Sequence, residues 1–254
     1  MADPEVPFDG GSHSAAVRVG RAVRRVGRPW SPATLDLLRH LEGVGFTGAP
    51  RALGFDDRGR EVLTFVDGES ADHLPDDRWI SRDDALVHLG ALLRAYHDAA
   101  ATFPWIGREW QVPTREPVET VCHNDLSPGN VVVREGVPVA FIDWESAAPG
   151  PRAWDLGYAA WYWVPFSSRT AGPATSIAEK ARRYCLLLDG YGIDADVEIL
   201  RTGIERMRQY LDHLRRLVAD GSEWEVRMAR RGQLDDMARD IAWVEEHAVE
   251  LTTS

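Results

Sequence analysis

The sequence predicts an α+β fold with two lobes: a small antiparallel β-sheet with one helix in the N-terminal lobe, and a mainly helical C-terminal lobe. Three observations support this class. Short β-branched segments dominate the first part of the chain, and helical periodicity dominates from residue 83 onward. Residues 121–143 combine a polar loop with short apolar strands. We expect residues 1–68 to form the N-lobe and residues 69–254 the C-lobe, which the chain is long enough to accommodate.

The strands of the N-lobe are predicted from alternating apolar and polar side chains. Residues 15–26 alternate apolar and basic side chains and are broken at Gly20, which indicates two strands. Residues 52–55 and 61–66, joined by a polar turn, indicate a further hairpin. Together these segments predict a small antiparallel sheet.

One helix is predicted between these strands, over residues 31–42. Leu35, Leu38 and Leu41 fall on one stripe of an amphipathic helix. Ser31 is expected as the N-cap, with a proline at the first helical position.

The rest of the chain is predicted to be mainly helical. Helical segments are expected over residues 83–100, 154–163, 174–190, 196–220 and 222–251. Residues 104–117 and 165–173 are expected to be irregular connections. Of the ten Trp residues, those near residue 150 could wall a binding pocket, although most are expected in the core.

The polar loop contains the most informative motif of the chain. His123, Asp125, Asn130 and Asp143 follow the order and spacing H-x-D-x-x-x-x-N and then D, which is typical of kinase-type phosphoryl transfer. Two short β-branched runs around residues 134–136 predict a hairpin. Such a hairpin would return Asp143 to the side of Asn130.

The residue types of this motif suit metal-assisted chemistry. Mg²⁺ prefers oxygen ligands, some of which a nucleotide's phosphates supply, and Asn130 and Asp143 can supply others. Asp125, on a tight loop, is placed to accept the proton of an acceptor hydroxyl and to hold that oxygen in line with the γ-phosphate. Two other interpretations stay open: a polar turn without function, and a metal-assisted hydrolase in which Asp125 and Asp143 are paired carboxylates.

The segment from His123 to Asp143, followed by Ala-Trp-Asp-Leu-Gly at residues 153–157, resembles the aminoglycoside phosphotransferase and choline kinase family, which has a protein-kinase-like fold. The resemblance implies that Asp125 is the catalytic base and that Asn130 and Asp143 are the metal ligands. It further implies that His123 organises the catalytic loop and that Asp155 is a structural support rather than a catalyst.

The phosphate-binding residue departs from the usual type: kinase-like enzymes use a lysine on a strand, and the only lysine of this chain is Lys180. Arg24 lies where family members place a lysine or arginine, and Arg25 on the other strand face is the alternative. The helix over residues 31–42 is the expected partner helix of this basic residue: Asp36 or Glu42 could pair with Arg24, although a surface position is the favoured interpretation of each acid. A solvated surface arginine is the other interpretation.

Two further segments are candidates for nucleotide binding. Ser12, in a Gly-Gly-Ser turn before the first predicted strand, could donate to a phosphate, although such a sequence is also an ordinary turn. The resemblance also implies that residues 64–68 are a hinge that binds the base through backbone groups, with Phe65 and Val66 as the candidates. Backbone recognition leaves ATP and GTP undistinguished.

The composition of the chain limits the classes of partner that we expect it to bind. The net charge of −11 disfavours binding to nucleic acid or anionic membrane, and it would suit a cationic acceptor, although solubility alone also explains it. No apolar run reaches membrane-spanning length and no secretory leader is visible, so a cytoplasmic protein is expected. Cys122 and Cys185 have neither disulfide nor metal spacing and are expected to be reduced and buried.

The sequence therefore predicts an enzyme, a small-molecule kinase that uses Mg²⁺ and ATP or GTP to phosphorylate a hydroxyl group. An aminoglycoside or another amino-bearing metabolite is one candidate acceptor class. A nucleotide-binding pseudoenzyme or regulatory module and a metal-dependent nucleotide hydrolase are the alternatives. Acceptor identity, oligomeric state and a role in drug resistance or metabolism stay open.

Overall fold

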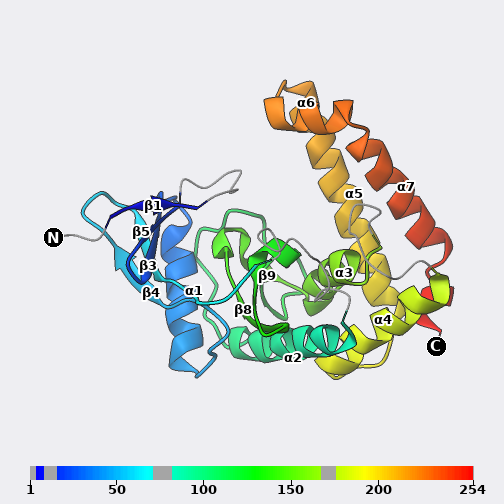
Figure 1. Ribbon diagram of the computed structural model, residues 1–254, viewed down its shortest axis with the longest axis horizontal. Coiled ribbons are helices and arrows are strands. Elements are labelled where there is room, and N and C mark those ends of the chain that lie inside the picture. Colours follow the sequence, from blue (N-terminus) through cyan, green and yellow to red (C-terminus); the bar gives the residue numbers. More distant parts are fainter. Residues whose placement is uncertain (1–3, 9–15, 71–81, 167–175, 254) are drawn as a thin grey trace. The chain divides into compact units, whose positions relative to one another are not determined.

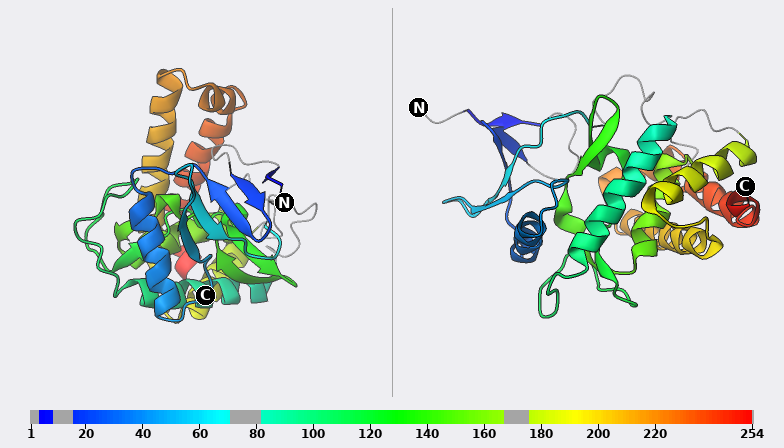
Figure 2. Two further views of the ribbon diagram at one scale, coloured as in Figure 1. Left: turned by 90° about the vertical axis from the view of Figure 1, so that its left-hand side faces the viewer. Right: turned by 90° about the horizontal axis from the view of Figure 1, so that it is seen from below.

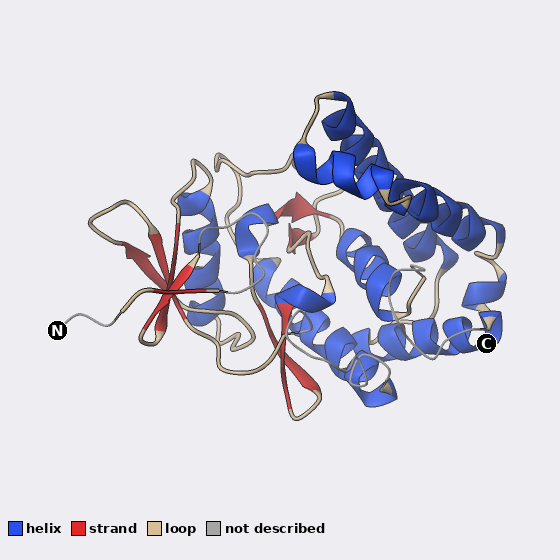
Figure 3. Ribbon diagram, turned by 45° about the horizontal axis from the view of Figure 1, so that its top comes forward, coloured by secondary structure: helices blue, strands red, loops and turns tan. Residues whose placement is uncertain are grey.

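The computed structural model describes residues 4–8, 16–70, 82–166 and 176–253. Two compact units, each discontinuous in sequence, make up the chain: residues 1–75 with 92–151, and residues 76–91 with 152–254. Strands are concentrated in the first unit and helices in the second (Figure 3), which confirms the predicted α+β class. The functional boundary at residue 68 stays a prediction.

The first unit contains a five-stranded antiparallel sheet in the order β1-β2-β3-β5-β4 (Figure 1). Its strands are β1 (Val6–Pro7), β2 (Val17–Val19), β3 (Ala22–Arg25), β4 (Ala52–Phe55) and β5 (Glu61–Thr64). The predicted strands are present, and β1 is an additional edge strand. In the pairing of β3 with β5, Arg25 lies directly opposite Glu61.

Helix α1 (Ser31–Gly43) lies beside this sheet (Figure 1). Its leucine stripe is buried, as predicted. Ser31 is not the N-cap: Trp30 occupies that position, without a side-chain bond, and the hydroxyl of Ser31 accepts a hydrogen bond from the backbone N–H of Arg28 across 2.8 Å. The serine therefore stabilises the turn that enters the helix rather than the first helical N–H groups.

Four short strands frame the predicted polar loop: β6 (Thr120–Cys122), β7 (Val131–Arg134), β8 (Val137–Phe141) and β9 (Ala148–Gly150). β7 and β8 form the predicted hairpin, turning through Glu135 and Gly136, whose φ angles of 53° and 82° are typical of the tight turns that join such strands. β6 pairs with β9, which the sequence did not indicate, because Ala-Pro-Gly has low strand propensity.

Helix α2 (Asp83–Ala100) has the predicted bounds and contributes residues to both units. The second unit continues with α3 (Arg152–Trp163), α4 (Ile177–Tyr191), α5 (Val197–Ala219), α6 (Glu223–Arg230) and α7 (Gln233–Glu246). α5 and α7 run side by side (Figure 2). The single helix predicted over residues 222–251 is wrong, because Gly232 adopts φ 74° and separates α6 from α7.

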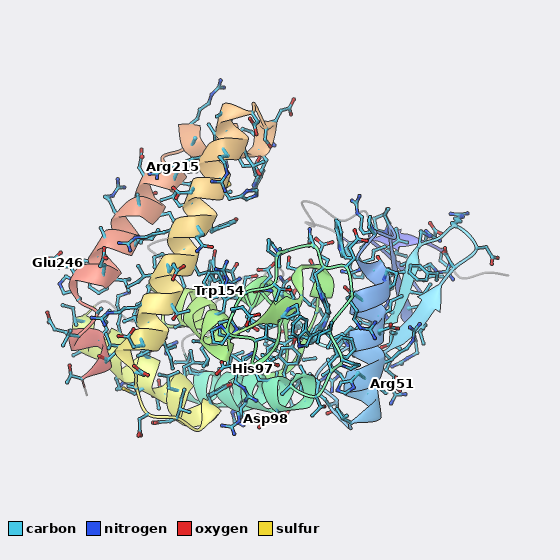
Figure 4. All side chains as sticks on the ribbon, turned by 180° about the vertical axis from the view of Figure 1, so that it is seen from behind. Arg51, His97, Asp98, Trp154, Arg215 and Glu246 are labelled. Atoms are coloured by element: carbon cyan, nitrogen blue, oxygen red, sulfur yellow. The ribbon has the colours of Figure 1, made fainter. Side chains whose placement is uncertain are left out.

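Two glycines bring α3 and α5 into close contact. A Cβ atom added to Gly157 would lie 2.4 Å from the Cα atom of Gly203. Beside this contact, Arg206 of α5 donates across 3.0 Å to the carbonyl of Trp154, a residue labelled in Figure 4, and approaches Asp155 to 3.7 Å. Asp155 is fully buried within α3, in keeping with the structural role that the resemblance implies.

Burial settles several smaller expectations. The Trp side chains near residue 150 are all buried in the core, namely Trp144, Trp154, Trp161 and Trp163. Cys122 is a buried free thiol, whereas Cys185 is partly exposed, which corrects the expectation for that residue. Within the described ranges, none of the helices combines the length and apolar character needed to cross a membrane.

Candidate active site

The predicted catalytic loop, residues 123–130, begins at His123, which follows β6 and is fully buried. Its Nδ1 accepts a hydrogen bond from the backbone N–H of Asp125 across 3.2 Å, and its Nε2 lies 3.0 Å from the carbonyl oxygen of Ile142. This pattern assigns the proton to Nε2. The ring also packs edge-on against Trp144, with 4.7 Å between ring centroids. His123 therefore ties the loop to the chain just before Asp143, as expected for a loop-organising residue.

Asp125 is held by Asn130. The side-chain amide of Asn130 donates to Oδ2 of Asp125 across 2.7 Å and to its carbonyl oxygen across 3.0 Å. The backbone of Asn130, at the end of a short 3₁₀ turn over Pro128–Asn130, accepts from the N–H of Ile142 across 2.9 Å. With its amide nitrogen engaged, Asn130 presents Oδ1, the kind of oxygen that a hard cation coordinates.

Asp143 follows β8 in a left-handed backbone conformation, with φ 62° and ψ 66°. Asn124, in the catalytic loop, is also left-handed, with φ 65°. Such conformations are uncommon for residues other than glycine and cluster at functional sites. The side chain of Asp143 is about one-third exposed, at 37%. The strained backbone thus presents an accessible carboxylate.

Arg25 joins the sheet to this carboxylate. Its Nη1 donates to Oδ1 of Asp143 across 2.8 Å, and its Nε donates to Glu61. Burial opposes the charge of the guanidinium, but the carboxylates of Glu61 and Asp143 hold the pKa of Arg25 above its ordinary value. Among the residues that the structure describes, no hydrogen-bond partner is found for the buried Nη2 of Arg25. One donor beside Asp143 is therefore unused.

Arg24, which the sequence favoured as the phosphate ligand, points toward Asp56 and not toward Asp143. Neighbouring strand residues face opposite sides of a sheet, and the Nε of Arg24 lies 3.9 Å from Asp56 in the turn between β4 and β5. The geometry favours Arg25, the alternative that the sequence kept open. Ser12 lies outside the described residues.

The two acids of α1 pair with arginines other than Arg24 and Arg25. Asp36 accepts from Arg39 across 2.9 Å and also pairs with Arg108. Glu42 pairs with Arg51, labelled in Figure 4, across 3.2 Å. Both carboxylates thus pair with other arginines instead of Arg24, and the pairing with Arg24 was the less favoured of the two interpretations.

The predicted hinge follows β5. The backbone N–H of Phe65 donates to the carbonyl of Arg21 across 2.8 Å, so it belongs to the sheet. The ring of Phe65 lies beneath the guanidinium of Arg18, 3.8 Å from the ring centroid. Beyond Val66, Glu69 and Val133 exchange two backbone hydrogen bonds, of 3.0 and 2.8 Å, which tie the hinge to β7. Base binding by Phe65 and Val66 stays a prediction.

Two acidic residues of the site were missed by sequence reasoning. Glu61 is buried against Arg25, and only the register between β3 and β5 reveals it. Glu145, two residues after Asp143, is partly buried. Burial raises the pKa of Glu145 above its ordinary value, the charge of Asp143 adds to the rise, and Arg25 opposes it. A second carboxylate near a predicted metal ligand was the available signal for Glu145.

The chain is similar to proteins of one family. A family model described as "Phosphotransferase enzyme family" matches residues 104–193. The chain is 37% identical to the trifolitoxin immunity protein of Rhizobium leguminosarum bv. trifolii, with 74% of each chain covered.

Solved structures share its fold. A choline/ethanolamine kinase family protein from Mesorhizobium loti aligns with a TM-score of 0.66 at 17% identity, covering 99% of this chain and 93% of that one. Amicoumacin kinase in complex with AMP-PNP, Ca²⁺ and its ligand aligns with a TM-score of 0.67 at 12% identity, covering 92% and 88%. These similarities confirm the kinase-like fold predicted from the sequence.

Proposed function

Because the chain belongs to the phosphotransferase enzyme family, the family of aminoglycoside phosphotransferases and choline kinases, we propose that it transfers the γ-phosphate of a nucleoside triphosphate to a hydroxyl group of a small molecule. Family membership makes the chain a small-molecule phosphotransferase. The nucleotide, the metal ion and the nature of the acceptor are the proposed parts.

The observation that best supports this function is the ion pair between Arg25 and Asp143. It connects a cation of the N-terminal sheet to the predicted metal ligand, and Asp143 in turn follows Ile142, whose backbone is bonded to His123 and Asn130. The cation proposed to bind phosphate and the carboxylate proposed to bind the metal are thus adjacent, which supports a site for phosphoryl transfer.

Asn130 and Asp143 are proposed to hold Mg²⁺. Across the described part of the chain, His, Cys, Asp and Glu side chains do not gather in threes as a metal site. Mg²⁺ is commonly bound by one or two protein oxygens together with substrate phosphates, and Asn130 and Asp143 would supply those protein oxygens. When bound, the ion would neutralise charge on the phosphate oxygens.

Asp125 is proposed to orient the acceptor hydroxyl and to take its proton as the oxygen attacks the γ-phosphorus. The hydrogen bond from Asn130 fixes the carboxylate, and the bond from Asp125 N–H to His123 fixes the backbone beneath it. Arg25 is proposed to contact phosphate oxygens through Nη1 and Nη2, because a guanidinium can bind such oxygens in pairs.

The acceptor is proposed to be a hydroxyl-bearing antibacterial compound. This rests on the relative named for immunity to trifolitoxin, which aligns over most of its length. An amine on the acceptor stays a candidate feature, because the net charge of −11 would favour a cation.

Phosphate transfer to a defined compound tests the proposal directly. The purified chain is incubated with Mg·ATP or Mg·GTP and a panel of hydroxyl-bearing antibacterial peptides, aminoglycosides and amino alcohols. Nucleoside diphosphate release is measured together with the mass of each acceptor. We expect one compound class to stimulate release and to gain one phosphate per molecule.

The same assay separates the alternatives. Diphosphate release that no compound stimulates would indicate a nucleotide hydrolase. Nucleotide binding without any release would indicate a pseudoenzyme or regulatory module. Either pattern over a broad panel would overturn the transferase proposal.

A cellular assay addresses the biological role. A sensitive bacterium expressing the chain is challenged with compounds that were phosphorylated in the panel. We expect protection from the wild-type chain and none from Asp125→Asn. Equal protection by both chains would show that any immunity comes from binding and not from transfer.

A further inference from the structure

Glu61 lies in the same sheet as Arg25 and directly across from it. The two residues are register partners on β5 and β3, neighbouring strands in Figure 1. Arg25 is 6% exposed and Glu61 is 2% exposed, and the Nε of Arg25 donates to Oε2 of Glu61. A buried guanidinium is therefore fixed by a carboxylate of the adjacent strand.

The same guanidinium also reaches the predicted metal ligand. Nη1 donates to Asp143, and Nη2 has no hydrogen-bond partner among the described residues. A buried donor without a partner is energetically unfavourable. A phosphate oxygen that accepted from Nη2 would relieve this cost.

Helix α1 does not supply the anchor. Its two acids, Asp36 and Glu42, are paired with other arginines. The acid that bonds Arg25 from within the sheet is therefore Glu61, its register partner on β5.

We propose that Glu61 is a positioning residue for nucleotide binding: it holds Arg25 from within the sheet so that Nη1 and Nη2 face Asp143 and the phosphates. This inference rests on the proposed function and deepens it. Metal binding would draw the charge of Asp143 toward the cation. The negative charge of Glu61 would still balance the buried guanidinium of Arg25, so Arg25 would keep its position when a metal ion binds.

A double-mutant cycle separates this role from that of an ordinary structural ion pair. The full chain is prepared as wild type, Glu61→Gln, Arg25→Met and the double variant. Affinities for Mg·AMP-PNP and for adenosine are measured by calorimetry. Asp36→Asn, which removes an acid of α1, is the matched control.

We expect Glu61→Gln to weaken Mg·AMP-PNP binding by about tenfold and to leave adenosine binding unchanged, since the lost contact concerns only phosphate. The double variant should bind no more weakly than Arg25→Met, because Glu61 acts through Arg25. Asp36→Asn should bind both ligands as the wild type does.

Three results would overturn the inference: unchanged Mg·AMP-PNP binding in Glu61→Gln, equal weakening of both ligands, or additive losses in the double variant. Should Glu61→Gln not fold, Glu61→Asp, which keeps the charge on a shorter side chain, replaces it in the same cycle and is judged by the same criteria. A wild-type chain that binds neither Mg·AMP-PNP better than adenosine nor Mg·GMP-PNP better than guanosine would overturn the proposed function together with this inference; if only the guanine nucleotide binds, the cycle is run with that pair. Tight wild-type binding with a failed cycle would overturn the inference alone.

Discussion

Arg25 donates a hydrogen bond to Asp143 across 2.8 Å, although 118 positions separate the two residues in the sequence. Both belong to the same compact unit, as does the catalytic loop that contains Asp125 and Asn130. The residues proposed to bind phosphate and metal are therefore neighbours within one unit of the fold.

Replacing Arg25 should weaken nucleotide binding, whereas replacing the adjacent Arg24 should not. Arg25→Met is expected to weaken Mg·AMP-PNP binding by about tenfold or more, because a charged contact to phosphate is lost. Arg24→Met should change it little, since Arg24 faces Asp56. Calorimetry on both variants measures the contrast, and a larger loss in Arg24→Met would return the phosphate-binding role to Arg24.

Asp125→Asn should slow phosphate transfer strongly while sparing nucleotide binding. The amide keeps the size of the carboxylate but is a poor proton acceptor, so kcat should fall by about 100-fold or more. The dissociation constant for Mg·AMP-PNP should stay near that of the wild type. Normal turnover in this variant would show that Asp125 is not the base.

Asp143→Asn should remove the metal dependence of nucleotide binding. The wild type is expected to bind AMP-PNP about tenfold more tightly with Mg²⁺ than with EDTA, and the variant should bind equally in both. Because Glu61 still compensates Arg25, the variant should remain folded. Thermal melting supplies the control for folding, and a retained Mg²⁺ effect would point to other ligands.

Gly157→Ala should destabilise the second unit, against the usual preference of helices for alanine. The added methyl group would lie 2.4 Å from Gly203, which forces α3 and α5 apart at a cost of about 1–3 kcal/mol. Urea unfolding measures the free energy of unfolding.

Gly43→Ala at the end of α1 is the matched control for that substitution. No atom lies within 4 Å of a Cβ atom added there. Alanine at this position should raise the free energy of unfolding by about 0.5 kcal/mol, from helix propensity and reduced chain entropy. A stabilised Gly157→Ala variant would show that the two helices can separate without loss.

Much of the fold could be predicted from periodicity and turn residues. The two strands broken at Gly20, the helix after Ser31, α2 and the hairpin β7–β8 all follow from local patterns. The pairing of β6 with β9 did not, because three residues containing proline and glycine have no strand pattern. The division between α6 and α7 depends on Gly232, and isolated glycines inside a helical pattern are ambiguous signals.

The sequence by itself determined the type of reaction. The spacing of His123, Asp125, Asn130 and Asp143 indicates phosphoryl transfer, because those residue types in that order suit a base and a hard metal ion. A local motif of this kind needs no knowledge of distant contacts.

Only the tertiary structure decided which arginine contacts Asp143 and which acid of the sheet bonds that arginine. Arg24 and Arg25 are adjacent in sequence, so alternation places them on opposite faces of β3 without saying which face adjoins the catalytic loop. Glu61 becomes the partner of Arg25 through the register of β3 with β5, while the acids of α1 are directed to other arginines. The register of β3 with β5, and the face of β3 that adjoins the loop, depend on burial across the whole unit. A local sequence pattern does not carry that information.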